Sequence, residues 1–280
     1  MKVFEHKKSL QAAIEAEKTA GKTIGFVPTM GALHQGHLEL MRQAKKETDI
    51  LVVSIFVNPI QFNNPADLEN YPRTLETDKE LLETVACDYL FAPDVDEMYP
   101  QPDTTVYRFG KLASVMEGAF RPGHFNGVAV VVKKLFEMVK PDKAFFGEKD
   151  FQQLAIIKAM TKQLSLPVEI VPCATVREGD GLAMSSRNRR LDAAERQLAP
   201  RIHQILSKAA TLRNVLSPQE MQQYAKNELD KIESFNLEYV AVADDVDLQP
   251  FEHWNSVLGA RIFVALQLGN VRLIDNIRIF

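Results

Sequence analysis

The segment Phe26-Val-Pro-Thr-Met-Gly-Ala-Leu-His-Gln-Gly-His37 lies between a pattern typical of a strand and a pattern typical of a helix. The run Ile24 to Val27 is short and apolar, as buried strands are. Pro28 has no N–H to donate, so we predict that the strand ends before it. Apolar residues return at helical spacing from Leu38 to Met41. The segment is therefore predicted to connect a strand to the first turn of a helix.

The predicted helix start has the composition of a phosphate-binding site. Unpaired backbone N–H groups and the positive end of the helix dipole attract anions there. Gly31 and Gly36 would let a triphosphate approach the backbone, and His34 and His37 would face the same anion. Taken singly, Gly31 is explained as a turn glycine and each histidine as a surface or helix-start residue. A zinc site is disfavoured, because His-x-x-His lacks the HExxH spacing and neither cysteine is near in sequence.

A second apolar run, Ile50 to Val57, follows this helix and is predicted to be a buried parallel strand. Residues 24–57 then form a right-handed βαβ unit. Neither GxGxxG nor GxxxxGKS/T occurs at its turn, which excludes the usual dinucleotide and P-loop sites. Around this unit we predict helices from the N-cap Ser9 to Ala20 with Gly21 at C′, over Asp78–Ala86 with a Thr77/Glu80 capping box, and over Val128–Val139, and strands at Asp88–Ala92, Lys143–Phe146 and Val168–Val171.

The C-terminal part of the chain has a different pattern. Helical periodicity dominates from Leu191, and three alternating runs at Leu237–Ala243, Arg261–Leu266 and Val271–Asp275 then predict strands. The expected fold is α/β, a Rossmann-like doubly wound parallel sheet with a smaller C-terminal α+β domain. We predict domains over residues 1–176 and 177–280, joined by a loop over residues 177–188.

Polar residues at the ends of other strands extend the candidate site. Gln61 follows the second strand, and Lys149 and Asp150 follow the strand Lys143–Phe146 just before a helix. Ligands of open α/β sheets bind at the carboxyl ends of the strands, so these residues would line one crevice. Lys149 would bind phosphate, and Asp150 a ribose hydroxyl or magnesium. A solvated loop glutamine and a solvated turn are the alternatives for these residues in isolation.

The stretch Val176–Asn188 interrupts the periodicity with two glycines and ends in a group of hydroxyl and guanidinium side chains. Arg187 can bind phosphate through its planar fork while Ser185 and Ser186 donate, which predicts a mobile phosphate clamp. An interdomain linker with an ordinary serine N-cap is the alternative. The glycine-rich segment Glu117–Gly127 either borders an anionic site or leads into a helix.

Composition excludes several classes of protein. The 280 residues are 46% hydrophobic and 25% charged, as expected for a globular chain with one large domain or a large and a small one. The net charge of -4 gives no reason to expect nucleic acid as a partner. Two cysteines without CxxC spacing and a charged N-terminus favour neither disulfides nor a signal peptide, so the cytoplasm is expected. No apolar run is long enough to suggest a membrane span.

The chain has three segments suited to phosphate binding and no Walker motif. This combination favours chemistry at the α-phosphate of ATP. Val27–His37 carries an HxGH motif, and Met184–Arg187 is placed like the second signature of the HxGH nucleotidylyltransferase superfamily, which the chain resembles. Four further segments make the chain similar to the pantothenate synthetase family of pantoate–β-alanine ligases: Val57–Phe62, Tyr71–Arg73, Arg121–Phe125 and Phe146–Gln153. The resemblance covers the whole chain and is densest up to Asn188.

The resemblance implies an AMP-forming ligation in two steps. Pantoate carboxylate attacks the α-phosphorus of ATP and releases pyrophosphate, and the amine of β-alanine then attacks pantoyl adenylate and releases AMP. Catalysis would rest on positioning and charge stabilisation by His34, His37, Lys149 and Arg187, with His37 as proton donor, and Gln61 and Gln153 would bind substrate. The implied ATP contacts are Met30, Gly31, Ala32, Leu33, His34, Gln35, Gly36, His37, Gly147, Glu148, Lys149, Asp150, Val176, Met184, Ser185, Ser186 and Arg187.

The resemblance further implies that ATP enters with Mg²⁺, without a tightly bound cofactor or a metal cage of protein ligands, and that the protein is a homodimer whose 1–176 domain binds ATP and pantoate. Two other functions are alternatives. An adenylyltransferase acting on a phosphorylated acceptor would need several cations where this chain offers glutamines. A regulatory nucleotide-binding module would not need His37 and Lys149 together. No nucleic acid or membrane partner is expected.

Overall fold

The computed structural model describes residues 1–63 and 65–280, and the chain divides into two compact units. The first unit comprises Met1–Phe109, Arg121–Glu148 and Gln153–Ala174. The second comprises Gly110–Phe120, Lys149–Gln152 and Thr175–Phe280. The domain division after residue 176 stays a prediction. None of the helices in the two described ranges has the length and apolar character needed to cross a membrane.

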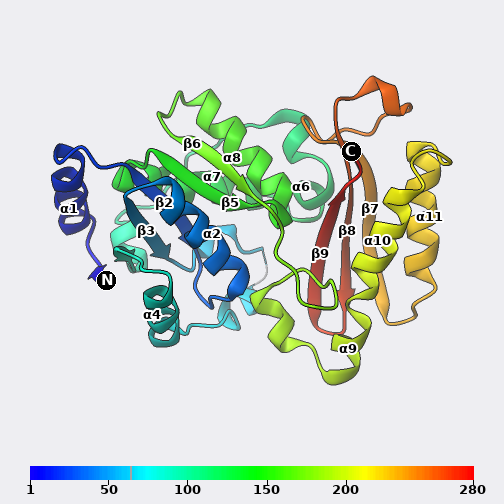
Figure 1. The fold of residues 1–280 in the computed structure, drawn as a ribbon, viewed down its shortest axis with the longest axis horizontal. Helices are drawn as coiled ribbons and strands as arrows, with labels where there is room; N and C mark the ends of the chain where they lie inside the picture. The colour runs from blue at the N-terminus through cyan, green and yellow to red at the C-terminus, as the bar shows by residue number, and fades with distance from the viewer. Residues whose placement is uncertain (64) are drawn as a thin grey trace. The chain divides into compact units, whose positions relative to one another are not determined.

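The first unit is built on a six-stranded parallel sheet (Figure 1). In spatial order its strands are β1 (Lys2–Phe4), β4 (Tyr89–Phe91), β3 (Ile50–Ile55), β2 (Ile24–Thr29), β5 (Lys143–Gly147) and β6 (Glu169–Cys173). Its helices are α1 (Lys7–Thr19), α2 (Gln35–Glu47), α3 (Pro65–Glu69), α4 (Leu75–Thr84), α5 (Val95–Met98), α7 (His124–Val139) and most of α8 (Phe151–Gln163). The predicted doubly wound α/β fold is confirmed.

The strand order reverses direction between β2 and β5. From β2 the chain proceeds outward through β3 to β4, and it then returns to place β5 on the other side of β2. Gly25 and Phe26 of β2 pair in parallel with Lys143 and Ala144 of β5. At such a reversal the loops that follow the two strands diverge and leave a crevice at their carboxyl ends. The topology therefore brings the start of the HxGH segment and the end of β5 to one edge of the sheet.

Alternate residues of β2 are covered by helices on opposite faces of the sheet. Val27 belongs to a buried cluster with Leu38 and Met41 of α2. Phe26, the preceding residue, packs its ring edge-on against Phe136 of α7, with the ring centroids 6.3 Å apart. Successive side chains of a strand point to opposite faces, so α2 and α7 bury the two faces of the sheet.

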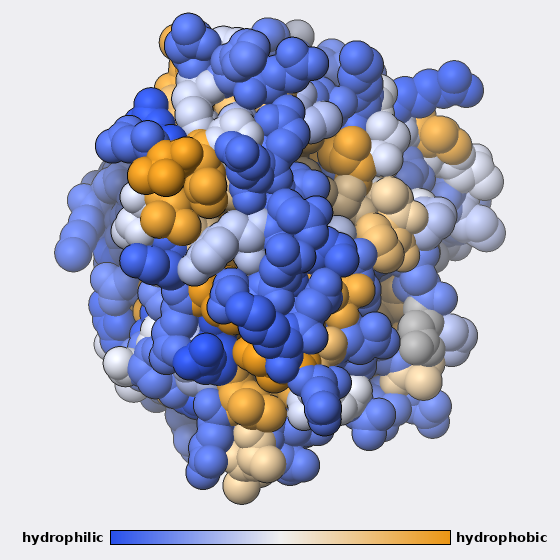
Figure 2. Space-filling model, turned by 90° about the vertical axis from the view of Figure 1, so that its right-hand side faces the viewer, coloured by the Kyte–Doolittle hydropathy of each residue, from blue (hydrophilic) through white to orange (hydrophobic). Residues whose placement is uncertain are grey.

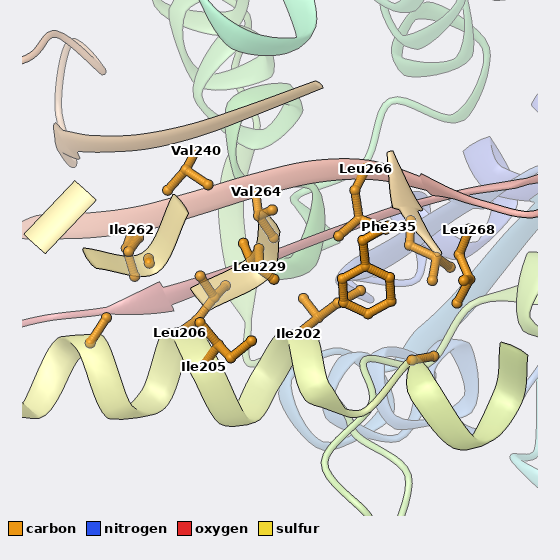
Figure 3. Close-up of a cluster of buried hydrophobic side chains, with 14 of the residues drawn as sticks. Ile202, Ile205, Leu206, Leu229, Phe235, Val240, Ile262, Val264, Leu266 and Leu268 are labelled. Atoms are coloured by element: carbon orange, nitrogen blue, oxygen red, sulfur yellow. The ribbon is translucent and has the colours of Figure 1, made fainter. Parts of the chain in front are cut away.

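The second unit contains an antiparallel sheet of β7 (Phe235–Asp244), β8 (Ala260–Leu268) and β9 (Val271–Arg278). Its helices are α6 (Met116–Phe120), α9 (Ala193–Leu198), α10 (Arg201–Thr211) and α11 (Pro218–Asp230). Figure 3 shows Ile202 and Leu206 of α10 directed toward Val264 and Leu266 of the sheet. This confirms the predicted smaller α+β part of the chain.

The face drawn in Figure 2 is mostly hydrophilic, with separate hydrophobic patches.

Near the N-terminus, one strand prediction is wrong and one strand was not predicted. The strand β2 continues through Pro28 to Thr29, with Pro28 opposite Ser54 of β3. Pairing of β2 with β5 ends at Phe26, so beyond that point the strand has a ladder on one side only, where proline is tolerated. The short edge strand β1 was not predicted, because Lys2–Phe4 is too brief to show a pattern.

Two predicted helix starts are also wrong. Ser9 does not cap α1; the helix begins at Lys7, whose N–H donates to Glu97 Oε1 at 3.0 Å, while Ser9 donates back to the His6 carbonyl. The helix α4 begins at Leu75, so no Thr77/Glu80 capping box forms. The acceptor for α1 comes from a residue far away in sequence, which local patterns do not reveal. Gly21 does follow the C-cap Ala20 with φ +77°, as predicted.

We predict that Leu206→Ala lowers the free energy of unfolding by about 2–5 kcal/mol, because Leu206 is fully buried in the hydrophobic core of the second unit and a cavity would remain. Leu258→Ala is the matched control, since that side chain is 95% exposed. Urea unfolding followed by circular dichroism measures both. Equal effects of the two substitutions would contradict the burial of Leu206 in this core.

Candidate active site

The turn between β2 and α2 has two consecutive residues with left-handed backbone, Gly31 at φ +79° and Ala32 at φ +50°. A side chain at position 31 would be strained by this φ and would place its Cβ 3.0 Å from Ile55 Cγ2. His34 then caps α2: its Nδ1 accepts a hydrogen bond from the Gly36 N–H at 3.1 Å. The HxGH segment therefore lies at a helix N-terminus, as predicted.

His34 and His37 are brought together by the first turn of α2. The His37 N–H donates to the His34 carbonyl at 2.9 Å, and the two ring centroids are 4.0 Å apart. Both side chains are half-buried. The arrangement gives a helix N-terminus with two adjacent imidazoles, which suits an anion; the catalytic roles of both residues stay predictions.

Gln61 lies on the short turn η1 (Pro59–Gln61) that follows β3, and it is buried rather than solvated. Its Oε1 accepts from Asn58 Nδ2 at 3.1 Å, and its Nε2 donates to Met30 Sδ at 2.9 Å. The structure thus brings Gln61 into contact with Met30, the first residue of the predicted ATP segment. A solvated loop glutamine is excluded.

Asn58 and Tyr99 support Gln61 and were not singled out from the sequence. Asn58 is 1% exposed; its Nδ2 also donates to the Gly127 carbonyl at 3.2 Å, and its Oδ1 accepts from the Tyr99 hydroxyl at 2.8 Å. The sequence did carry a signal for Asn58. This residue follows a buried strand and lies in Val57–Phe62, one of the segments on which the family resemblance rests. Tyr99 is 41 residues away and left no such signal.

The segment around His124 leads into a helix, as one of its two sequence interpretations held. Gly123, with φ +83°, is the N-cap of α7, and His124 is the first helical residue. His124 Nδ1 lies 2.9 Å from the Gln61 carbonyl and Nε2 lies 3.1 Å from Arg121 Nη1. A carbonyl only accepts and a guanidinium only donates, so His124 carries its proton on Nδ1. It thereby holds the backbone of Gln61.

The second candidate segment follows β5. Gly147 ends the strand, the turn η3 covers Glu148–Asp150, and α8 starts at Phe151. In the second unit, the Lys149 ammonium lies 3.8 Å from Asp150 Oδ2, and the Lys149 carbonyl accepts from Asn276 Nδ2 at 3.0 Å. Gln153 is half-buried on α8. The strand–turn–helix geometry predicted for this segment is confirmed, while the ligand roles stay predictions.

The segment from Val176 to Arg187 is anchored at its start. Arg177 makes a two-pronged salt bridge with Asp275, at 2.7 and 2.9 Å, and the Met184 N–H donates to the Val176 carbonyl at 3.0 Å. Ser185 caps the short turn η4 (Ser186–Arg190), with its Oγ accepting from the Arg187 N–H. The structure therefore joins Val176 to Met184, and Ser185 is an N-cap as the alternative interpretation held. A phosphate role for Arg187 stays a prediction.

Glu117 connects α6 to the start of α8 within the second unit. Its carboxylate accepts two hydrogen bonds from Arg272, each at 2.7 Å, and one from the Tyr239 hydroxyl at 2.8 Å. Its N–H donates to Gln152 Oε1 at 3.0 Å. Burial, together with the charge of Glu117, raises the pKa of Tyr239 well above its usual value, so this hydroxyl remains a donor.

Neither cysteine is suited to nucleophilic or metal chemistry. Burial raises the pKa of the Cys87 thiol and of the Cys173 thiol to about 12, so neither is a thiolate near neutral pH. Within residues 1–63 and 65–280, no group of three or more His, Cys, Asp or Glu side chains is arranged to hold a metal ion.

Comparison with known proteins identifies the family. A family model described as pantoate-beta-alanine ligase matches residues 2–278. The chain belongs to this family. It is 50% identical over 278 residues to "Pantothenate synthetase" of Porphyromonas gingivalis W83 and 49% identical over 278 residues to "Pantothenate synthetase" of Bacteroides fragilis YCH46, covering 99% of both sequences in each pair.

Solved structures agree with this assignment. A pantothenate synthetase from Thermus thermophilus has a TM-score of 0.94 with 42% identity, and the match covers 100% of both chains. A pantoate-beta-alanine ligase from Francisella tularensis, complexed with beta-gamma ATP and beta-alanine, has a TM-score of 0.83 with 35% identity, covering 100% of this chain and 98% of the other. The whole described fold is therefore that of the pantoate-beta-alanine ligase family.

The support of Gln61 by Tyr99 leads to a test. We predict that Tyr99→Phe raises the Michaelis constant for pantoate about 5- to 10-fold, because the buried Asn58 Oδ1 loses its donor and Asn58 no longer holds Gln61 firmly. The Michaelis constant for ATP should change little. Tyr107→Phe, which removes a phenol hydroxyl elsewhere in the same unit, is the control. Unchanged pantoate kinetics in Tyr99→Phe would refute the supporting role.

Proposed function

We propose that the chain catalyses the ATP-dependent ligation of pantoate and β-alanine to pantothenate through pantoyl adenylate, releasing pyrophosphate and AMP. The observation that carries this proposal is membership of the pantoate-beta-alanine ligase family over residues 2–278. The HxGH segment, held at the start of α2 with its two imidazoles adjacent, supplies a matching anion site. The enzyme is then an acid–amine ligase of pantothenate and coenzyme A biosynthesis.

In the first step, an oxygen of the pantoate carboxylate forms a bond to the α-phosphorus and the bond to pyrophosphate breaks. The charge on the phosphates is stabilised by the N-terminus of α2 together with His34, His37, Lys149 and Arg187. His37 is the proton donor, and the departing pyrophosphate takes the proton. The proposed ATP contacts are Met30–His37, Gly147–Asp150, Val176 and Met184–Arg187. Mg²⁺ enters bound to the phosphates of ATP, as part of the substrate.

In the second step, the amine of β-alanine attacks the acyl carbon of pantoyl adenylate, loses a proton, and AMP leaves. Gln61 and Gln153 orient pantoate, and Gln61 also lies near the amine. No bond to the enzyme forms, so the protein contributes position and charge. We also propose that the enzyme is located in the cytoplasm, where ATP is supplied. We propose that it is a homodimer, and sedimentation velocity measurements test this.

Adenylyl transfer to a phosphorylated acceptor is not favoured by the family assignment. The side chain of Gln61 contacts neutral groups, the amide of Asn58 and the thioether of Met30. Such surroundings suit the hydroxyls and carboxylate of a small hydroxy acid. Neither the Asn58 amide nor the Met30 thioether adds a positive charge for an acceptor phosphate.

The order of the two steps is testable by isotope exchange. We expect exchange of labelled pyrophosphate into ATP to require pantoate and to proceed without β-alanine, because the adenylate forms before the amine reacts. Strict dependence on β-alanine would indicate a concerted reaction. Formation of ADP in place of AMP would refute attack at the α-phosphorus.

His37→Ala should lower the rate of adenylation on the order of 10²- to 10³-fold with little change in pantoate affinity, since its contact strengthens as charge develops on the phosphates. Single-turnover quench experiments measure the adenylation step directly. His253→Ala, an exposed histidine of the second unit, is the control. Adenylation at close to the wild-type rate would show that His37 has no catalytic role and is only a residue of the first turn of α2.

A further inference from the structure

A buried carboxylate on α4 is bound to the turn that carries the HxGH motif. Asp78 is 1% exposed, and its two oxygens accept hydrogen bonds from two successive backbone amides. Oδ2 accepts from the Ala32 N–H at 2.9 Å, and Oδ1 accepts from the Leu33 N–H at 2.8 Å. The hydroxyl of Thr74 also donates to Oδ2, at 3.2 Å. The carboxylate is therefore fully engaged within the protein.

The amides that Asp78 binds belong to the part of the turn with unusual backbone geometry. Ala32 has φ +50°, a conformation that glycine adopts freely and alanine only against steric cost. Two N–H groups converging on one carboxylate hold that conformation. Close packing strengthens the match, because a Cβ at position 31 would lie 3.0 Å from Asp78 Oδ2. The hydrogen bonds to Asp78 thus offset the steric cost of this turn. The next residues depend on the turn to begin α2.

The position of Asp78 on α4 suits a carboxylate side chain. Asp78 lies in the first turns of α4, which starts at Leu75, so the positive end of that helix dipole favours a carboxylate. A neutral amide of the same shape would keep one acceptor but would direct an NH₂ group at one of the two backbone donors. Asparagine therefore cannot replace both bonds.

We propose that Asp78 is a positioning residue for adenylation: it holds Ala32 and Leu33 so that His34 starts α2 and the His34–His37 pair is presented together. His34 follows Leu33 directly, caps α2 through Nδ1, and lies against the His37 ring. Asp78 acts through the backbone and does not touch substrate. The inference rests on the proposed function, because it assigns the turn a part in that reaction.

The test compares Asp78→Asn with Glu76→Gln, a change of the same kind on the same helix at a side chain that is 83% exposed. We expect Asp78→Asn to lower kcat for pantoate-dependent pyrophosphate exchange about 10- to 100-fold, with a smaller rise in the Michaelis constant for ATP. Glu76→Gln should behave as wild type. Wild-type kcat in Asp78→Asn would overturn the proposal.

A second substitution separates positioning from general stability. Glycine at position 32 adopts φ +50° without cost, so Ala32→Gly should restore several-fold of the activity lost in Asp78→Asn, while lowering the midpoint of urea unfolding or leaving it unchanged. If Asp78→Asn instead lowered activity through a general loss of stability, a substitution that adds flexibility would give no gain in kcat. If Asp78→Asn does not fold, Thr74→Val removes only the hydroxyl donor and should lower kcat less, with Thr74→Ser as the hydroxyl-retaining control.

Hydrogen exchange of the segment 30–38 in ligand-free protein gives a readout independent of catalysis. We expect faster exchange of the Ala32 and Leu33 amides in Asp78→Asn than in wild type, and unchanged exchange in Glu76→Gln. Equal protection in all three proteins would overturn the positioning role. Wild-type protein that shows this protection but no pantoate-dependent exchange would instead refute the proposed function.

Discussion

A buried carboxylate with both oxygens bound to backbone N–H groups holds the turn between β2 and α2. The two hydrogen bonds from the Ala32 and Leu33 amides to Asp78 offset the steric cost of an alanine at φ +50°. The cap of α2 by His34 and the approach of the two imidazoles both follow from this turn. Because β2 lies at the reversal of strand order, the turn is also at the edge where an α/β sheet binds its ligands.

The same kind of support recurs at the other candidate residues. Gln61 is held by Asn58, which is held in turn by Tyr99, and the carbonyl of Lys149 is held by Asn276. Each network draws a supporting side chain from a distant part of the chain. A buried polar group without a hydrogen-bond partner destabilises the folded protein. A network in which every group has its partner therefore favours a single arrangement of these side chains. Site residues held in this way keep the geometry that charge stabilisation requires.

The sequence was most informative where a pattern is local and repeated. The alternation of strands and helices predicted the parallel sheet, the HxGH segment predicted a helix start, and the C-terminal runs predicted the strands of the second unit. Local reasoning failed at the ends of elements. Pro28 lies inside β2 because the neighbouring ladder has already ended, and α1 takes its N-terminal acceptor from Glu97. Neither fact is visible in a short window of sequence.

By itself the sequence determined the fold class, the family and the positions along the chain where phosphate chemistry is expected. Periodicity and motif spacing carry that information, since both depend on residues close together in the chain. Only the tertiary structure decided that Gln61 is buried, that His124 carries its proton on Nδ1, and that Asp78 holds the turn before α2. The reason is physical: a buried donor or acceptor is satisfied by whichever group the fold brings within about 3 Å, regardless of its separation in sequence.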